Sequence, residues 1–186
     1  MASLEGRRIA VLATDGVEQI ELTAPAKALR EAGAEVKIVS PQSGAIQGMD
    51  HDEKADVIPV DIELKDARPE AFDALLLPGG VANPDKLRAI LEAVKFVGAF
   101  VAADKPIAAI CHGPWTLINA GGVKGKRMTS WPSLQQDLIN AGALWSDEPV
   151  VTDRQLLTSR KPDDIPKFNA AMIALFAAPG PRRNMA

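Results

Sequence analysis

The chain has 186 residues, of which 47% are hydrophobic and 24% charged, and its net charge at pH 7 is −3. This length fits one domain with a full core and leaves little room for two, and the composition excludes disordered and membrane-embedded classes. Because the lysines and arginines are scattered along the chain, we expect no nucleic-acid-binding surface.

The chain has one cysteine and two histidines. One cysteine excludes an internal disulfide framework and a cysteine-rich zinc site, and two histidines offer little to any other metal, so we expect no metal and no cofactor. The start of the chain lacks the pattern of a signal peptide, and no apolar run approaches the roughly 18 residues of a membrane span. We therefore expect a cytoplasmic protein that forms a single domain over 1–186, with frayed ends at 1–6 and 179–186.

Short apolar runs alternate with helical patterns in the first two thirds of the chain. Strands are predicted at 7–13, 34–40, 72–80 and 106–111, where nearly continuous apolar residues are typical of buried parallel strands. The first helix has Ile20, Leu22, Ala26 and Leu29 on one face and ends at Gly33, and we expect Pro25 to kink or split it. Residues 41–64 read as extended strands outside the main sheet, and 84–104 as one long helix.

The last third predicts helices at 113–121 and 132–142, short strands at 143–147, 149–153 and 155–160, and a terminal helix at 163–178. In that helix Ile165, Phe168, Met172 and Phe176 share one face. The alternation of strands and helices predicts an α/β fold with a mainly parallel central sheet and helices on both faces.

Three polar or glycine-rich segments directly follow predicted strands. They are Asp15–Glu18, Gly79–Gly80 and Cys111–His112. In open α/β sheets, ligands bind beyond the carboxyl ends of the strands, so these segments should meet at one edge of the sheet.

The segment around Cys111 matches a nucleophile elbow. Ala109 and Gly113 supply the small residues two positions before and after the nucleophile, and Pro114 opens the next helix. A thiol at a helix N-terminus is favoured as thiolate. The alternative is that Cys111 is a small buried core residue, but the combined strand, spacing and helix start favour a reactive thiol.

Gly79, Gly80 and Glu18 each allow two interpretations. The glycines either only form a turn or also direct backbone N–H groups at an oxyanion, with the His112 N–H as a further donor. Glu18 is either an ordinary carboxylate at a helix start or an acid that faces the thiol. A protonated Glu18 would stabilise the thiolate and an ionised one would raise the thiol pKa, and the sequence leaves both possibilities open.

These residues and the segments "DGVEQIEL", "AAICHGPWTLINAG" and "TSWPSLQQDLINAGA" closely resemble the PfpI family, within the class I glutamine amidotransferase-like superfamily. The resemblance covers about Arg7 to Ala177. It implies a flavodoxin-like three-layer sandwich and a homodimer or higher homo-oligomer. It also implies that Cys111 is the nucleophile, His112 its base and Glu18 the acid that hydrogen-bonds the thiol.

In PfpI-type peptidases, a Glu shortly after the two glycines completes the triad across a subunit interface. The matching residue here is Asp85, which is one methylene shorter and could instead be only a charge at the start of a helix. The glutamine amidotransferases of the superfamily take their histidine from late in the chain. No histidine follows His112, which argues against that activity.

Three functions fit these residues. The first is a stress-protective cysteine hydrolase of the PfpI type, acting on peptides or acyl groups through Cys111, His112 and Asp85. The second is a cofactor-independent glyoxalase or deglycase, in which Cys111 forms a hemithioacetal with a small carbonyl and Glu18 moves the proton. The third is a non-catalytic redox sensor or chaperone that uses oxidation of Cys111.

Overall fold

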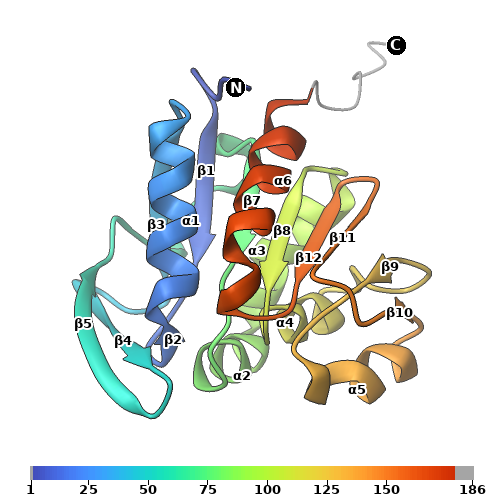
Figure 1. Ribbon diagram of the computed structural model, residues 1–186. Helices are drawn as coiled ribbons and strands as arrows, with labels where there is room; N and C mark the ends of the chain where they lie inside the picture. The colour runs from blue at the N-terminus through green and yellow to red at the C-terminus, as the bar shows by residue number, and fades with distance from the viewer. Residues whose placement is uncertain (1, 179–186) are drawn as a thin grey trace.

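The computed structural model describes residues 2–178, and its centre is a seven-stranded sheet in the order β11-β12-β8-β7-β1-β3-β6 (Figure 1). Neighbouring strands are parallel except for the antiparallel pair β11–β12. The strands are β1 (Arg8–Leu12), β3 (Glu35–Ser40), β6 (Ile62–Glu63), β7 (Ala74–Leu77), β8 (Ile107–Ile110), β11 (Val150–Asp153) and β12 (Leu156–Ser159).

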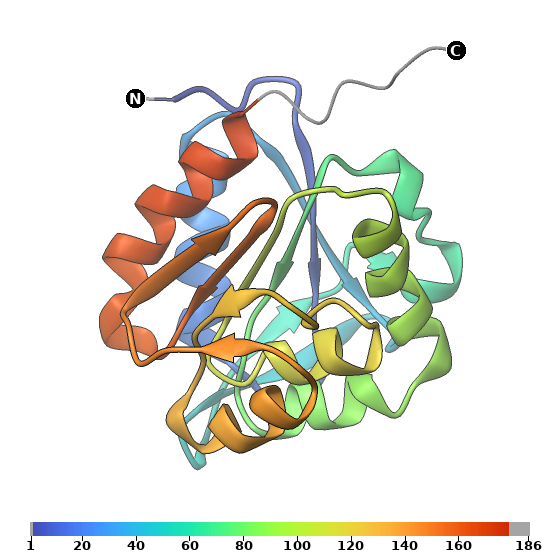
Figure 2. The same cartoon turned by 90° about the vertical axis from the view of Figure 1, so that its right-hand side faces the viewer.

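Helices cover both faces of this sheet, as the sequence predicts (Figure 2). One face packs against α1 (Gln19–Glu31) and α6 (Ile165–Ala177). The other packs against α2 (Ala82–Arg88), α3 (Leu91–Ala102), α4 (Pro114–Asn119) and α5 (Gln135–Asn140). Four short 3₁₀ turns complete the helical segments of the described chain: Leu64–Asp66, Pro69–Ala71, Pro132–Leu134 and Pro162–Asp164.

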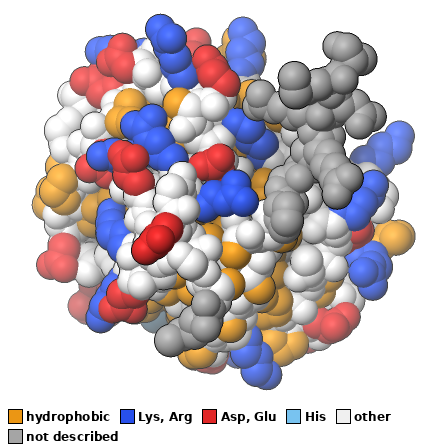
Figure 3. All heavy atoms as spheres, turned by 90° about the horizontal axis from the view of Figure 1, so that it is seen from above, with side chains coloured by type: hydrophobic (Ala, Val, Ile, Leu, Met, Phe, Trp, Pro, Cys, Tyr) orange, Lys and Arg blue, Asp and Glu red, His pale blue; other side chains and the backbone are white. Residues whose placement is uncertain are grey.

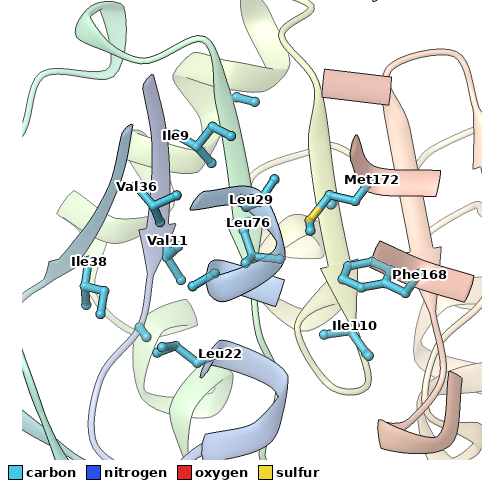
Figure 4. Packing of buried hydrophobic residues seen from close by; sticks show 14 of the residues in the cluster. Ile9, Val11, Leu22, Leu29, Val36, Ile38, Leu76, Ile110, Phe168 and Met172 are labelled. Atoms are coloured by element: carbon cyan, nitrogen blue, oxygen red, sulfur yellow. The ribbon is translucent and has the colours of Figure 1, made fainter. Parts of the chain in front are cut away.

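The central strands are buried on both faces because successive side chains enter opposite layers. Ile9 and Val11 face α1 and α6, whereas Ala10 and Leu12 face the opposite layer. Figure 4 shows the first layer, where strand residues such as Val11 and Leu76 meet Leu22 and Leu29 of α1 and Phe168 and Met172 of α6. The apolar register predicted for the terminal helix is confirmed, since all four of its members are buried.

The segment after β3 leaves the main sheet, as predicted. Strands β2 (Val17–Glu18), β4 (Ala45–Asp50) and β5 (Glu53–Pro59) form a separate three-stranded sheet. A second small sheet pairs β9 (Arg127–Met128) with β10 (Leu144–Trp145). In Figure 1 the β2–β4–β5 sheet lies near the carboxyl ends of the parallel strands, away from the two termini.

Two helix predictions need correction. The predicted helix at 84–104 is two helices, because Ile90 is extended and separates α2 from α3. Because of this break, the side of α3 that faces the core is not the side that one continuous helix would bury. Leu91 is exposed, whereas Phe96 and Phe100 are buried. Helix α1 is not split at Pro25, which lies on its buried face within one continuous helix.

The N-terminal segment is more ordered than predicted, since Leu4 is fully buried and its N–H donates to the carbonyl of Ala32. The predicted fraying at residue 1 and at 179–186 lies outside the described residues. On the face that carries the termini, positive and negative side chains are interspersed (Figure 3). Within 2–178, the helices are all too short or too polar to cross a membrane.

Candidate active site

Cys111 follows β8 on a sharp turn. Its φ of 61° lies in the left-handed region, which is rare for a residue with a side chain and is strained. Its N–H donates to the carbonyl of Ser159 and its carbonyl accepts from Trp131, so hydrogen bonds hold this conformation on both sides. The backbone therefore has the geometry of the predicted nucleophile elbow.

The turn leaves no space for a side chain at Gly113. An added Cβ would clash with the carbonyl oxygen of Leu77 and lie 3.0 Å from that of Ile110. We expect Gly113→Ala to lower the free energy of unfolding by about 3 kcal/mol or more, since only backbone movement relieves the clash. Gly98→Ala in α3 is the matched control: its nearest heavy atom would be 4.0 Å away, and a helical alanine should stabilise by about 0.5–1 kcal/mol. Urea denaturation measures both, and equal effects would contradict this account of the turn.

Gly79 and Gly80 pack directly against the elbow. A Cβ on Gly79 would lie 2.7 Å from Cβ of Cys111 and 2.9 Å from the His112 nitrogen. The Gly79 N–H donates to Oε2 of Glu21 at 2.9 Å, so this donor is already engaged. The Gly80 and His112 N–H groups favour the charged form of Cys111, and the Gly80 N–H also favours that of Glu21.

Asn83, which sequence reasoning missed, holds the glycine loop in place. Its side chain is fully buried, and its amide donates to the carbonyls of Pro78 and Gly79, both at 3.0 Å. Its carbonyl accepts from the N–H of Thr14 at 2.8 Å. This one side chain therefore connects the loop after β7 to the end of β1.

The acid beside the thiol is Glu21 and not Glu18, which corrects the expected assignment. Glu21 is fully buried, and its carboxyl lies beside Cys111, where the two groups shift each other's pKa. Glu18 occupies the N-cap position of α1 without a side-chain capping bond. The buried face of α1 explains the difference, because Glu21 is in register with Pro25 and Leu29. The expected stripe included Ile20 instead, and that side chain is 46% exposed.

Glu18 lies in the same pocket but has another partner. Its carboxylate accepts the N–H of His51 at 3.1 Å. His51 is exposed in the turn between β4 and β5, and its Nδ1 is 2.9 Å from Oδ1 of Asp50. Within 2–178, these three residues are the group whose spacing would suit a metal ion, since their ligand atoms lie within 4.8 Å of one another.

Cys111 and Glu21 titrate as one coupled pair. Burial raises the pKa of Glu21 from 4.5 to about 8, with the charge of Glu18 adding to the effect. Burial and the Glu21 carboxylate raise the pKa of the thiol above its usual range. Burial thus outweighs the helix N-terminus that was expected to favour the thiolate. The pair holds two protons at neutral pH and loses the first near pH 8.

His112 lies against the thiol, with its Nδ1 3.1 Å from Sγ of Cys111. Burial lowers its pKa to about 4, so the ring is neutral at pH 7 and is a weak proton acceptor. Trp131 stacks on the ring at a centroid distance of 5.8 Å and Trp115 meets it edge-on at 5.1 Å. Within this chain, Glu21 is therefore the stronger base available to the thiol.

A cavity of about 550 Å³ opens over these groups. Its lining residues come from β2 and α1, the start of the segment after the two glycines, the elbow and α4, the β4–β5 turn and later segments: Glu18, Glu21, His51, Asp52, Val81, Cys111, His112, Trp115, Trp131, Ser133 and Pro162. The two glycines lie behind this lining, against Glu18 and the elbow. The predicted convergence at one sheet edge is thus confirmed. Trp115 and Trp131 both line the cavity.

Asp85 does not line this cavity. It is exposed in the first turn of α2, and its N–H donates to the carbonyl of Val81. It makes no contact with His112 in the described chain, and the expected contact, which crosses a subunit interface, stays a prediction.

Comparison with known proteins agrees with this geometry. Residues 7–175 match the model of the DJ-1/PfpI family. The chain is 44% identical to "Putative cysteine protease YraA" of Bacillus subtilis, covering 91% of this chain and 98% of that protein. It is 42% identical to "Protein/nucleic acid deglycase 2" of Escherichia coli, covering 92% of this chain and 99% of that protein. The crystal structure of Drosophila melanogaster DJ-1beta superposes with a TM-score of 0.83 at 28% identity, covering 92% of this chain and 90% of that one.

The chain therefore belongs to the DJ-1/PfpI family, with the flavodoxin-like α/β fold of that family. Relatives that carry protease and deglycase names indicate an enzyme of this family.

Proposed function

We propose that this protein is a cofactor-independent enzyme for small reactive carbonyls such as methylglyoxal and their adducts, with a stress-protective role in the cytoplasm. The observation that carries the proposal is the fully buried Glu21 carboxyl beside the Cys111 thiol, with its Oε1 free of any other partner. This arrangement needs no residue from another chain, whereas the hydrolytic triad needs Asp85. A relative named as a deglycase supports the same choice.

The reaction with methylglyoxal needs only these two side chains as nucleophile and proton carrier. Sγ of Cys111 attacks the aldehyde carbon, and the thiol proton passes to the Glu21 carboxylate and then to the new alkoxide, which gives a hemithioacetal. Glu21 then takes the proton from that carbon and returns it to the neighbouring ketone carbon, while the hydroxyl proton of the hemithioacetal moves to the ketone oxygen. The product is the thioester of lactate with Cys111. Water hydrolyses the thioester to lactate and frees Cys111. One carbon is oxidised and its neighbour reduced, so no outside electron donor is needed.

The Gly80 and His112 N–H groups would hold the oxygen that becomes negative during the attack. His112, neutral and packed between the two tryptophans, would position the sulfur and not remove its proton.

A peptidase of the PfpI type is the second candidate, supported by the 3.1 Å approach of His112 to the thiol and by the relative named a putative cysteine protease. In this mechanism Asp85 of a neighbouring subunit orients His112 and raises its pKa. The protein would then be a homodimer or larger, with Asp85 at the interface.

Parallel assays of one preparation separate the candidates. We expect wild type to convert methylglyoxal to lactate and not to cleave a fluorogenic peptide, and Cys111→Ala to do neither. Asp85→Asn should change methylglyoxal turnover less than about threefold, because it lies outside the cavity. Peptide cleavage that Asp85→Asn lowers more than a hundredfold would instead establish the peptidase. Turnover of neither substrate with clean peroxide oxidation of Cys111 would favour a redox sensor.

A further inference from the structure

The cavity over Cys111 is lined by acidic side chains without a balancing lysine or arginine. Of the described residues that line it, Glu18, Glu21 and Asp52 are acidic. The pKa of Glu21 is about 8, so the negative charge at pH 7 rests mainly on Glu18 and Asp52. The two histidines are the basic groups in the lining, and His112 is neutral because burial lowers its pKa to about 4.

The rim of the cavity strengthens this imbalance. Residues 50–54 are the end of β4, the turn after it and the start of β5, and they carry three carboxylates against one lysine. His51 lies in the same turn and offsets part of this charge when protonated, since its hydrogen bond to Asp50 and the charge of Glu18 raise its pKa.

Cations near the other side of the cavity are already paired. Next to Pro162, Arg160 binds both Asp147 and Asp164, and Lys161 lies 3.2 Å from Asp163. These two cations therefore face three carboxylates and add no net positive charge to that wall.

The remaining wall is aromatic. The guanidinium of Arg88 packs over the ring of Trp115 at 5.4 Å and donates to the side-chain oxygen of Asn119. Arg88 is not among the residues that line the cavity. Trp131 lines the cavity and is 38% exposed. Carboxylates together with an accessible indole form a surface that attracts cations, because the ring face and the carboxylates both carry negative potential.

We propose that this pocket favours positively charged ligands at the Cys111 sulfur over anionic ones such as phosphorylated carbonyls, a selection set by Glu18, Asp52 and the exposed face of Trp131. The identity of the reaction rests on the proposed function above. The charge preference of the pocket does not, and it can be measured on the thiol alone.

The single cysteine makes this measurement direct. Aminoethyl methanethiosulfonate is a cation and sulfonatoethyl methanethiosulfonate an anion of similar size. With either reagent Sγ forms a disulfide bond to the reagent's sulfenyl sulfur, methanesulfinate leaves with the electron pair, and the thiol proton goes to solvent. The ratio of the two rates on Cys111, divided by the ratio on uncharged 2-mercaptoethanol, reports the potential at the sulfur.

We expect this normalised ratio to exceed about tenfold at pH 7.5 and low salt, and to fall severalfold in 0.5 M NaCl. Asp52→Asn and Glu18→Gln should each lower it by roughly two- to fivefold. Glu70→Gln is the matched control, since it removes one exposed carboxylate in the turn before β7, at the opposite end of the sheet, and should leave the ratio unchanged.

A normalised ratio near one, or a ratio that neither Asp52→Asn nor Glu18→Gln changes, would overturn the proposal. Failure of both reagents to react would do so too, because the pocket would then admit neither ion. Turnover of neutral methylglyoxal in the same preparation keeps the two proposals separate. Its absence with a high ratio removes only the proposed reaction, and its presence with a ratio near one removes only the charge selection.

Discussion

Glu21→Gln should lower the rate of methylglyoxal turnover by roughly a hundredfold to ten-thousandfold, the usual contribution of a positioned general acid–base. The amide preserves the shape of the side chain but cannot accept the thiol proton. His112 cannot replace it, because burial lowers its pKa to about 4 and leaves it a far weaker base than Glu21. The measurement is lactate formation at saturating methylglyoxal, which reports the chemical step separately from binding.

Glu18→Gln is the matched control for this result. It makes the same chemical change three residues away, on a carboxylate that accepts from His51 and does not hydrogen-bond the thiol. We expect a loss of less than about tenfold, since Glu18 acts on the pair only through its charge. A larger loss for Glu18→Gln than for Glu21→Gln would reverse the assignment of the two residues.

Glu21→Gln should also change how stability depends on pH. The folded protein holds the Glu21 proton up to about pH 8, whereas in the unfolded chain the pKa is near 4.5. Stability from this group is therefore fully present below pH 4.5 and is lost as pH rises towards 8. Because Gln cannot ionise, the free energy of unfolding of wild type should fall relative to the variant by about 4 kcal/mol between pH 4.5 and 8.5.

Urea denaturation of both proteins at pH 5 and pH 8.5 measures this difference, and the other titrating groups cancel in the comparison. Parallel pH profiles for the two proteins would mean that Glu21 titrates in the folded state as it does in the unfolded chain. The protonated carboxyl would then have no structural basis.

Much of the fold could be predicted because each strand of the sheet carries its own signal. Runs such as Ala74–Leu77 are apolar throughout, and only strands covered on both faces have that pattern. The order of strands and helices then places the elbow, the two glycines and the start of α1 at one edge without any knowledge of side-chain contacts. The break at Ile90 was missed because Leu91 and Val94 continue a helical apolar pattern across it.

The acid was misassigned for a physical reason. Glu18 comes directly after a strand end, where an exposed acid is expected, whereas Glu21 lies on a buried helix face, where a carboxyl is rare. Its register with Pro25 and Leu29 is the sequence signal that indicates Glu21. Asn83 gave no comparable signal, since an asparagine near a helix start usually faces solvent. Its three hydrogen bonds depend on two loops that meet only in the folded chain.

The central claim is that Cys111 and Glu21 titrate as a pair with two protons, and that the thiol reacts once the pair has lost one of these protons. The rate of iodoacetamide reaction with the single cysteine, measured from pH 5 to 10 in wild type and Glu21→Gln, tests it most directly. The claim predicts a rise with a midpoint near pH 8 in wild type, where Glu21 loses its proton and can then accept that of the thiol. In Glu21→Gln no base of comparable strength lies beside the thiol, and burial alone still raises the pKa of Cys111, so the rise near pH 8 should be absent and the rate at pH 8 should be about tenfold lower. Superimposable profiles for the two proteins would contradict it.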